Sequence, residues 1–313
     1  MSFTVLSEAA YREFINSLDY VAFPQRPEAV AARSSLGTKF EYVGVVDNGE
    51  IRAAAAVRYQ PWKRFFRRAD IAFGPSFAEG SIPALAEFLA GLKRHLSAKK
   101  NVLSFRLSPY ITRRVYDGDT PGPDTAEGTQ IDSIVEAAGG HRLEKTFEDA
   151  SDIQISFIYV KDLEGMDFAA VNKSVNQQLR TGFNRMGTPG LEVRFASPDE
   201  FGTLLQVWEH TTERSGMAEL TPSLARYYEQ LARELGDDAF LPIAVLDCPA
   251  YLEGIDVEVS EISARVAAIE ENQARLEAEG KTLGKKQRNQ LKELNSRLEV
   301  LSLIHISEPT RLL

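Results

Sequence analysis

The sequence has one cysteine, few histidines and no long apolar run, and so lacks the usual basis for disulfides, histidine-rich metal sites and membrane spans. A single cysteine, Cys248, excludes an intrachain disulfide and is typical of a protein kept in a reducing cytoplasm. The 4 histidines are scattered without ligand spacing, so we expect no metal site. No apolar run approaches the length of a membrane span, and the N-terminus lacks the basic start and apolar core of a signal peptide. These absences predict a cytoplasmic protein.

Acidic residues outnumber basic ones, 45 to 36, but basic residues gather in two segments. The net charge of −9 over 313 residues argues against indiscriminate binding of nucleic acid. Residues 58–68 nevertheless combine five positive charges and four aromatic residues with no acid. We interpret residues 62–68 as a strand-edge or surface cluster, with contact to tRNA or anionic lipid as the alternative.

Residues 255–300 predict an antiparallel hairpin of two helices. Apolar residues recur at three- and four-residue steps on each arm, which is the seam of a coiled coil. They are Val259, Ile262, Val266, Ile269 and Leu276 on the first arm, and Leu291, Leu294, Leu298 and Leu301 on the second. Gly280 and Gly284 supply the reversal between the arms.

The charges of this hairpin differ between its arms. The first arm is acidic, whereas residues 281–298 carry six basic residues against the single acid Glu293. Cross-helix ion pairing is one interpretation. The other is a basic stripe for RNA phosphates, for which the candidates are Lys285, Lys286 and Arg288.

The sequence from Ser302 onward abandons the apolar repeat. Residues 301–311 match the translation of a transposon-derived sequencing adapter, so we expect residues 301–313 to be an adapter-derived tail and exclude them from fold reasoning. On this interpretation the sequence is the front portion of a longer protein, inactive and prone to aggregation by itself.

The body before the hairpin alternates strands and helices. An Asn48-Gly49 turn joins strands 41–46 and 51–59, and residues 117–128 are a loop by composition. The other elements expected in the first half are a helix from Ser7, a strand at 68–73, a helix at 83–98, a strand at 101–107 and a helix at 131–138. In the second half they are strands at 153–160, 191–195 and 239–246 and helices at 168–183, 198–215 and 222–235. Two mixed α/β units in tandem, the second carrying the helical hairpin, are therefore predicted.

Residues 153–228 resemble the FemABX family of peptidoglycan aminoacyltransferases. The match runs through a strand with Gln154, the segments 172–180, 190–194 and 208–217, and the pair Tyr227-Tyr228. Weaker echoes are Phe23-Pro24-Gln25, with Arg33 downstream, and residues 107–110. The order and spacing of these segments carry the resemblance, since no single motif is decisive.

The resemblance implies an α/β (α+β) fold of two tandem acetyltransferase-like (GNAT-like) subdomains with the coiled-coil arm inserted in the second. The expected domains are 1–150, an incomplete second subdomain at 151–254, and the arm at 255–300. It implies transfer of an amino acid from aminoacyl-tRNA to the stem-peptide amine of a nucleotide-linked or lipid-linked muropeptide, with peripheral membrane contact in the second case. No cofactor is expected. The lysine that some members place after the arm falls outside this sequence, so the catalytic residues stay unknown.

Such a reaction needs positioning and charge stabilisation rather than a protein nucleophile. The acceptor is anionic, so arginine forks and tyrosine hydroxyls suit its site. By the resemblance, the substrate-binding candidates are Arg214, Arg180, Arg33, Tyr228, Tyr227 and Asn176. By composition alone, Arg180 and Asn176 also fit a solvated helix face, and Arg214 fits a helix-dipole partner. The adjacent tyrosines point apart on a helix, which predicts one in the core and one facing a ligand.

Two other classes stay open. One is an acetyl-coenzyme A-dependent N-acetyltransferase, which usually grips pyrophosphate with a glycine-rich turn that opens a helix; residues 185–190 have the wrong spacing for it. The other is a tRNA- or protein-binding adaptor that uses the helical hairpin, although an adaptor has no need of the α/β units.

Overall fold

The computed structural model describes residues 1–143, 157–216 and 218–311, and divides them between two compact units. Unit 1 comprises Met1–Val160 and Pro198–Ala239, and unit 2 comprises Lys161–Ser197 and Phe240–Leu313. The expected boundary at residues 150 and 151 lies outside the described residues. Residues 198–239, which we assigned to the second subdomain, group with unit 1. The division into two GNAT-like subdomains and an inserted arm therefore stays a prediction.

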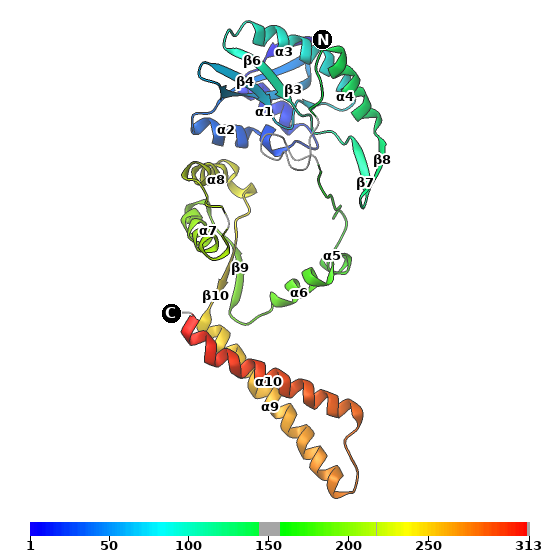
Figure 1. Ribbon diagram of the computed structural model, residues 1–313, viewed down its shortest axis with the longest axis vertical. Coiled ribbons are helices and arrows are strands. Elements are labelled where there is room, and N and C mark those ends of the chain that lie inside the picture. Colours follow the sequence, from blue (N-terminus) through cyan, green and yellow to red (C-terminus); the bar gives the residue numbers. More distant parts are fainter. Residues whose placement is uncertain (144–156, 217, 312–313) are drawn as a thin grey trace. The chain divides into compact units, whose positions relative to one another are not determined.

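Unit 1 is built on a mixed sheet in the order β1-β2-β3-β4-β6, with β5 paired to β3 (Figure 1). Neighbours are antiparallel except β4 and β6, which run parallel. The strands are β1 (Ser2–Val5), β2 (Lys39–Asp47), β3 (Glu50–Trp62), β4 (Phe66–Ile71), β5 (Ser76–Phe77) and β6 (Val102–Leu107). The turn between β2 and β3 is the predicted one, because Asn48 and Gly49 both adopt the positive φ that a tight hairpin turn requires.

Strand β3 is buried on both of its faces through a run of four alanines followed by Val57. Ala53, Ala55 and Val57 belong to one hydrophobic cluster, and Ala54 and Ala56 belong to a second cluster on the opposite face. Because side chains alternate between the two faces of a strand, this one segment contributes to both hydrophobic clusters. Such burial explains why these residues show no polar alternation.

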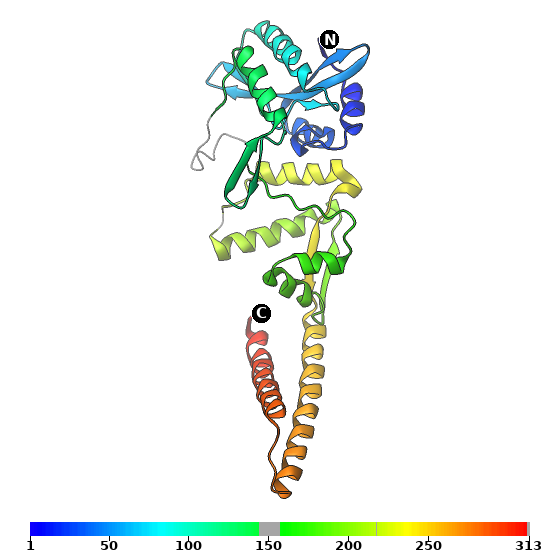
Figure 2. The ribbon, with the colours of Figure 1, turned by 90° about the vertical axis from the view of Figure 1, so that its right-hand side faces the viewer.

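Helices cover both faces of this sheet (Figures 1 and 2). Helices α3 (Leu85–Ser97) and α4 (Ala126–Ala137) supply apolar residues to the cluster around Ala53 and Val57. Helix α1 (Glu8–Asn16), which Ser7 caps as predicted, and α2 (Pro27–Ser35) supply the cluster around Ala54 and Ala56. Short 3₁₀ turns, η1 (Phe23–Gln25) and η2 (Ile82–Ala84), precede α2 and α3.

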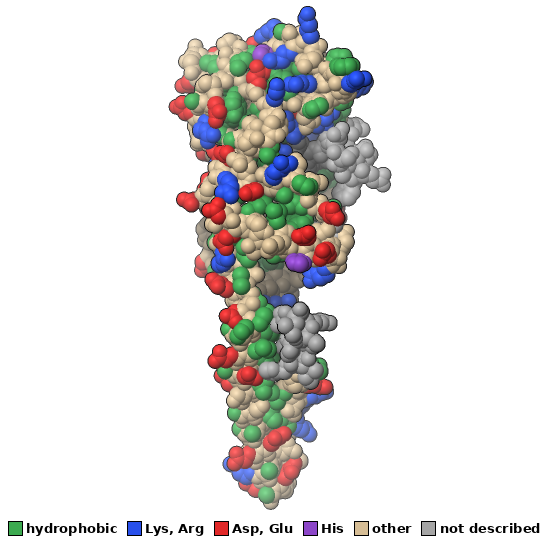
Figure 3. All heavy atoms as spheres, turned by 90° about the vertical axis from the view of Figure 1, so that its left-hand side faces the viewer, with side chains coloured by type: hydrophobic (Ala, Val, Ile, Leu, Met, Phe, Trp, Pro, Cys, Tyr) green, Lys and Arg blue, Asp and Glu red, His purple; other side chains and the backbone are tan. Residues whose placement is uncertain are grey.

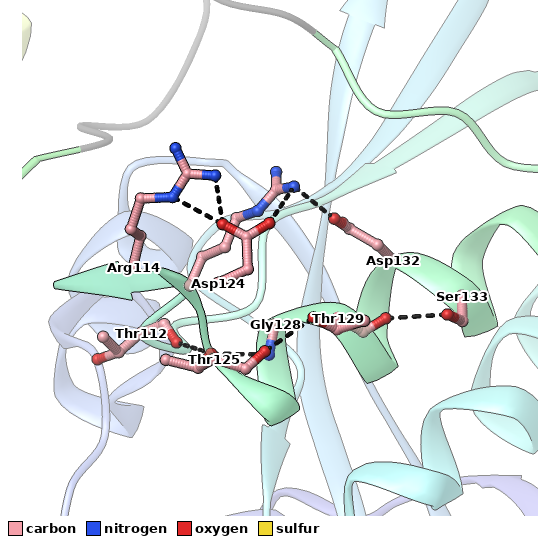
Figure 4. Close-up of polar contacts among 9 residues, drawn as sticks. Thr112, Arg114, Asp124, Thr125, Gly128, Thr129, Asp132 and Ser133 are labelled. Carbon is pink, nitrogen blue, oxygen red and sulfur yellow. Dashed lines mark hydrogen bonds and ion pairs between the residues drawn. The ribbon is translucent and has the colours of Figure 1, made fainter. Parts of the chain in front are cut away.

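The prediction of a loop at residues 117–128 is wrong. Strands β7 (Arg114–Asp117) and β8 (Thr120–Asp124) form an antiparallel hairpin, and α4 begins at Ala126 rather than near 131. Asp124 accepts hydrogen bonds from Arg114 Nε at 2.7 Å and from Arg113 at 3.1 Å, and the Thr125 hydroxyl caps α4 at the Gly128 amide (Figure 4). These contacts between side chains override a composition that is typical of loops.

The C-terminal part of unit 1 contains two of the predicted helices, α7 (Phe201–Ser215) and α8 (Pro222–Leu235), with the 3₁₀ turns η3 (Pro198–Glu200) and η4 (Gly236–Asp238). Gly216 ends α7 in the left-handed conformation, and Thr221 caps α8. Helix α8 packs on α2 through Ala29, Ala32 and Leu231.

Unit 2 contains a break that the pattern did not predict. The single helix expected at 168–183 is two helices, α5 (Phe168–Ser174) and α6 (Gln177–Arg185). Val175 is extended, and the Asn176 side chain caps α6 by accepting from the Leu179 amide at 2.9 Å. Of the strand predicted at 153–160, residues 153–156 lie outside the described residues and residues 157–160 are not in a strand.

Strands β9 (Leu191–Phe195) and β10 (Pro242–Leu246) pair antiparallel in unit 2, close to the predicted bounds. Gly190 precedes β9 with a φ of +71°, and a Cβ there would lie 2.5 Å from the Asp247 carbonyl oxygen. Residue 190 must therefore be glycine, because any side chain there would clash with the backbone at Asp247, which follows β10.

The helical hairpin of unit 2 consists of α9 (Cys248–Ala278) and α10 (Lys285–Arg311). Ile255, Ile262, Val266, Leu294 and Leu301 form its buried seam, which follows the predicted apolar repeat. Helix α9 begins seven residues before the predicted arm, because Asp247 caps it. Helix α10 continues beyond Leu301 through most of the segment we had excluded as a tail. Within the described part of the chain, no helix is both long and apolar enough to span a bilayer.

Candidate functional site

Arg33 and Tyr227 are candidate residues that lie far apart in the sequence and meet in unit 1. The Arg33 guanidinium lies over the Tyr227 ring, 4.0 Å from its centroid. Arg33 comes from the last turn of α2, and the Tyr227 ring packs with Ala29 and Ala32 of the same helix. A guanidinium that stacks on an aromatic face keeps its N–H donors in the plane of the group. Tyr227 thus orients Arg33 while its donors stay available to an anion.

Tyr228 and Arg214 are more exposed than Tyr227. Tyr227 is 6% exposed and Tyr228 is 42% exposed, so one tyrosine is core and the other faces outward, as helical spacing predicts. The two rings lie 5.5 Å apart. Arg214 is exposed in the last turn of α7, where it also suits the negative end of the helix dipole. Arg33, Tyr227 and Tyr228 therefore form one cluster, which we call the α2–α8 cluster; Arg214 lies on a neighbouring helix of the same unit.

Asn176 and Arg180 lie in unit 2 and have structural partners. The Asn176 side-chain oxygen is used as the cap of α6. The Arg180 guanidinium reaches back to the Lys173 carbonyl at the end of α5, 3.5 Å away. These contacts hold α5 and α6 at the break between them. A ligand would meet only the remaining donors of the two side chains.

Lys285, Lys286 and Arg288 lie exposed in the first turn of α10. That turn has no acidic residue. Cations are unfavourable at the N-terminus of a helix, where the dipole is already positive. Further along, Arg297 donates to both carboxylate oxygens of Glu258 at 2.8 and 3.1 Å. Cross-helix ion pairing is therefore confirmed for Arg297, whereas the three cations of the first turn have no ion pair within the described residues.

Two motifs that carry the resemblance have roles in holding the fold. Gln25 of the Phe23-Pro24-Gln25 motif is 1% exposed and binds the backbone of β3 and of the turn that follows β4. Its Oε1 accepts from the Ala56 amide at 2.9 Å, and its Nε2 donates to the Ala72 carbonyl at 2.8 Å. Ser108 accepts from the Phe73 amide at 3.1 Å. Gln25 therefore joins η1 to the sheet rather than lining a site.

An aromatic cluster at the ends of β4 and β6 was missed by the sequence reasoning. The Tyr20 and Tyr110 rings stack at 5.0 Å, and Phe73 lies 5.9 Å from Tyr110. A hydrogen bond with Tyr110, together with partial burial, raises the pKa of Tyr20. The sequence feature that could have revealed this cluster is Tyr110, in the motif at residues 107–110. We used that motif for the family resemblance and did not consider Tyr110 as a site residue.

A charged cluster at the opposite end of the sheet joins β2, β3 and α3. The Glu41 carboxylate accepts from the Tyr59 hydroxyl at 2.6 Å, contacts His95 Nε2 at 2.9 Å and pairs with Lys99 at 3.3 Å. Burial opposes ionisation of Glu41, but the hydrogen bonds from Tyr59 and His95 and the charge of Lys99 lower its pKa overall. Burial and the same carboxylate raise the pKa of Tyr59.

Comparison with known proteins points to one family. The profile of the FemAB family matches residues 6–305. The chain is 26% identical to aminoacyltransferase FemB of Staphylococcus epidermidis over 265 residues, which are 83% of this chain and 62% of FemB. It is 22% identical to aminoacyltransferase FemA of the same species over 303 residues, 96% of this chain and 70% of FemA. The crystal structure of FemX superposes with a TM-score of 0.60 at 16% identity, covering 97% of this chain and 71% of FemX. The chain thus has the fold of FemX and spans about 62% of the length of FemB.

Proposed function

The chain belongs to the FemAB family, and from this premise we propose that it transfers an amino acid from aminoacyl-tRNA to the stem-peptide amine of a peptidoglycan precursor. The product would be the start of an interpeptide bridge. The names of the FemB and FemA relatives support aminoacyl transfer. The choice of aminoacyl-tRNA as donor and of a muropeptide as acceptor belongs to the proposal.

The observation that carries the proposal within the structure is the stacking of Arg33 on Tyr227. A muropeptide precursor presents phosphates and carboxylates, and a planar guanidinium can bind either with two parallel hydrogen bonds. Tyr228 adds an exposed phenol beside Tyr227. We assign precursor binding to the α2–α8 cluster, with Arg214 as a further anion-binding residue.

Aminoacyl transfer requires mainly that the protein position its two substrates. An aminoacyl ester is already activated, and a neutral amine attacks its carbonyl without help from a protein nucleophile. The C–O bond to the ribose breaks as the new C–N bond forms, and the proton of the amine passes to the leaving hydroxyl or to solvent. The tRNA would be held by the first turn of α10, where Lys285, Lys286 and Arg288 are exposed.

Transfer can be tested directly with the full-length protein. It is incubated with tRNA charged with radiolabelled amino acids and with nucleotide-linked or lipid-linked muropeptide, and the acceptor is analysed for a gain of one aminoacyl mass. Acetyl-coenzyme A replaces the charged tRNA in a parallel reaction. We expect transfer from charged tRNA alone. Acetylation without aminoacylation would contradict the proposal, and tRNA binding without any transfer would favour the adaptor function.

The site assignment is tested by Arg33→Gln and Arg214→Gln. Each variant should raise the KM for the precursor about tenfold, since a charge-assisted hydrogen bond is worth roughly 1.5 kcal/mol or more. Arg94→Gln, which removes an exposed arginine from α3 of the same unit, is the matched control and should leave the KM unchanged. Unchanged KM values in Arg33→Gln would remove the α2–α8 cluster from the precursor site.

A further inference from the structure

The hairpin between β3 and β4 ends in a tip of five residues. Trp62 and Phe66 pair across the last rung of the ladder, and residues 63–65 form the turn, in which Lys63 has a positive φ. The tip is rich in exposed apolar surface, since Phe65 is 73% exposed, Trp62 38% and Phe66 36%. Three exposed aromatic residues in one turn make a patch that needs a function, whereas isolated ones do not.

Basic side chains flank these rings. The Lys63 ammonium lies 4.9 Å from the centroid of the Trp62 ring, and the Arg64 guanidinium lies 5.2 Å from that of Phe65. Residues 58–68 contain no acid. On the face drawn in Figure 3, Lys and Arg side chains lie among hydrophobic ones over the upper part of unit 1. The tip therefore combines apolar wedges with positive charge.

An open pocket lies at the base of the same hairpin. It has a volume of about 360 Å³ and is lined in part by Lys39, Arg67, Lys99 and Asn101. Glu41 is the acid in its lining and is paired with Lys99. Among the described residues, the side chains of Lys39 and Arg67 form no ion pair. The pocket thus carries an excess of positive charge next to the aromatic tip.

We propose that this tip docks the protein on an anionic phospholipid surface. Phe65, Phe66 and Trp62 would enter the boundary between headgroups and acyl chains, and Lys63 and Arg64 would remain among the headgroups. The pocket of Lys39, Arg67 and Lys99 would hold a headgroup phosphate. Protein segments that bind membrane surfaces combine these two features, and the attraction grows with the negative charge of the leaflet.

RNA is the other partner that such residues can bind, but the geometry favours a membrane. Single-stranded RNA is bound along a groove in which successive bases stack on aromatic faces. Here the aromatic residues lie in the last rung and the turn of the β3–β4 hairpin, beyond the residues of β4 that pair with β6, and the most exposed of them, Phe65, lies within the turn itself. The inference does not rest on aminoacyl transfer, because it concerns only how the protein reaches a surface.

Binding to vesicles tests the proposal. The protein is sedimented with vesicles of phosphatidylcholine containing roughly a third phosphatidylglycerol, and with vesicles of phosphatidylcholine alone. We expect binding to the anionic vesicles. Phe65→Ser should weaken it about tenfold through the lost apolar burial, and Lys63→Gln or Arg64→Gln about fivefold each. Phe240→Ser is the matched control, because Phe240 is 72% exposed in unit 2 and should not matter.

Insertion is measured separately by fluorescence in a Trp208→Phe background, where Trp62 is the remaining tryptophan. Trp62 emission should shift to the blue and be quenched by brominated lipid when anionic vesicles are added. Equal binding by the wild type and Phe65→Ser, or an unshifted Trp62 spectrum, would overturn the proposal. Tip variants that lose tRNA binding while vesicle binding stays intact would assign the tip to RNA instead.

Discussion

Among single residues, Gln25 joins separate parts of unit 1 by hydrogen bonds. Its backbone carbonyl accepts from the buried Tyr11 hydroxyl at 2.7 Å, and its side chain serves Ala56 and Ala72. A buried amide in this position satisfies backbone groups that no strand partner reaches. The sequence motif that contains Gln25 is thus explained by the fold.

Gln25→Ala should lower the free energy of unfolding by about 2–4 kcal/mol, because it leaves the Ala56 amide and the Ala72 carbonyl buried without partners. Urea denaturation followed by tryptophan fluorescence measures the change. Gln130→Ala, at an exposed position of the same unit, should change it by less than about 0.5 kcal/mol. If Gln25→Ala lowers the free energy of unfolding as little as the control does, water replaces the hydrogen bonds of the Gln25 amide.

Glu41 gives unit 1 a dependence of stability on pH. Its pKa is lowered in the folded state, so the folded state favours the ionised form more than the unfolded state does. The resulting stability is fully present above the ordinary glutamate pKa of about 4.3 and is lost as the pH falls through the lower, folded value. Glu41→Gln should therefore flatten the acid limb of the stability curve below about pH 5, as measured by urea denaturation at several pH values. The same acid limb in both proteins would show that other carboxylates cause it.

Among the elements, the α9–α10 hairpin depends on a narrow apolar seam. Leu294 is 8% exposed within it, whereas the side chains of Arg297 and Glu258 are 50% and 40% exposed. Leu294→Ala should destabilise the hairpin by about 2–4 kcal/mol, and Arg297→Ala by less than about 1 kcal/mol. Hydrogen exchange of the α9 amides measures both effects. A larger effect from Arg297→Ala would mean that ion pairs dominate the hairpin.

The basic residues in the first turn of α10 are predicted to bind tRNA. Lys285→Gln with Lys286→Gln should weaken tRNA binding and reduce the slope of log affinity against log salt by about 1–2, since one counterion is released for each phosphate contact. Arg265→Gln, an exposed cation on the acidic helix α9, is the control and should leave the slope unchanged. Identical slopes in all three proteins would exclude this turn from the tRNA site.

The structure of an element could be predicted from the sequence where residues close together in the chain determine it. Asn48-Gly49 and the seam of α9 and α10 are local patterns, and both have the predicted structure. The β7–β8 hairpin was missed because residues 117–124 have no apolar alternation, and the break before α6 was missed because the cap at Asn176 outweighs helical periodicity. The stacking of Arg33 on Tyr227 joins distant helices, so no local pattern could predict it. The roles of the site residues stay predictions.

At the scale of the whole molecule, the two units have separate cores. The clusters around Ala53 and around Tyr11 lie in unit 1, and the seam of α9 and α10 lies in unit 2. Cores that share no residues need not unfold together. The FemAB fold is thus stabilised in two places in this chain.

Unfolding in urea should therefore show two transitions. Trp62 and Trp208 both lie in unit 1, so tryptophan fluorescence reports that unit, whereas circular dichroism at the helical band also reports α9 and α10. We expect part of the dichroism signal to be lost at lower urea than the fluorescence change, because the seam buries fewer large side chains than the sheet does. Coincident transitions would show that the units unfold as one.

The alanine run of β3 also limits how this protein can evolve. Each of Ala53, Ala54, Ala55 and Ala56 is at most 1% exposed, and the strand has a packed core on either side. Single-base changes convert an alanine codon to valine, threonine or other larger residues, and added volume in a packed core costs about 1–3 kcal/mol. Lineages that accumulate neutral mutations elsewhere should therefore leave these four alanines almost unchanged, so the run offers a fixed reference for aligning diverged members of the family.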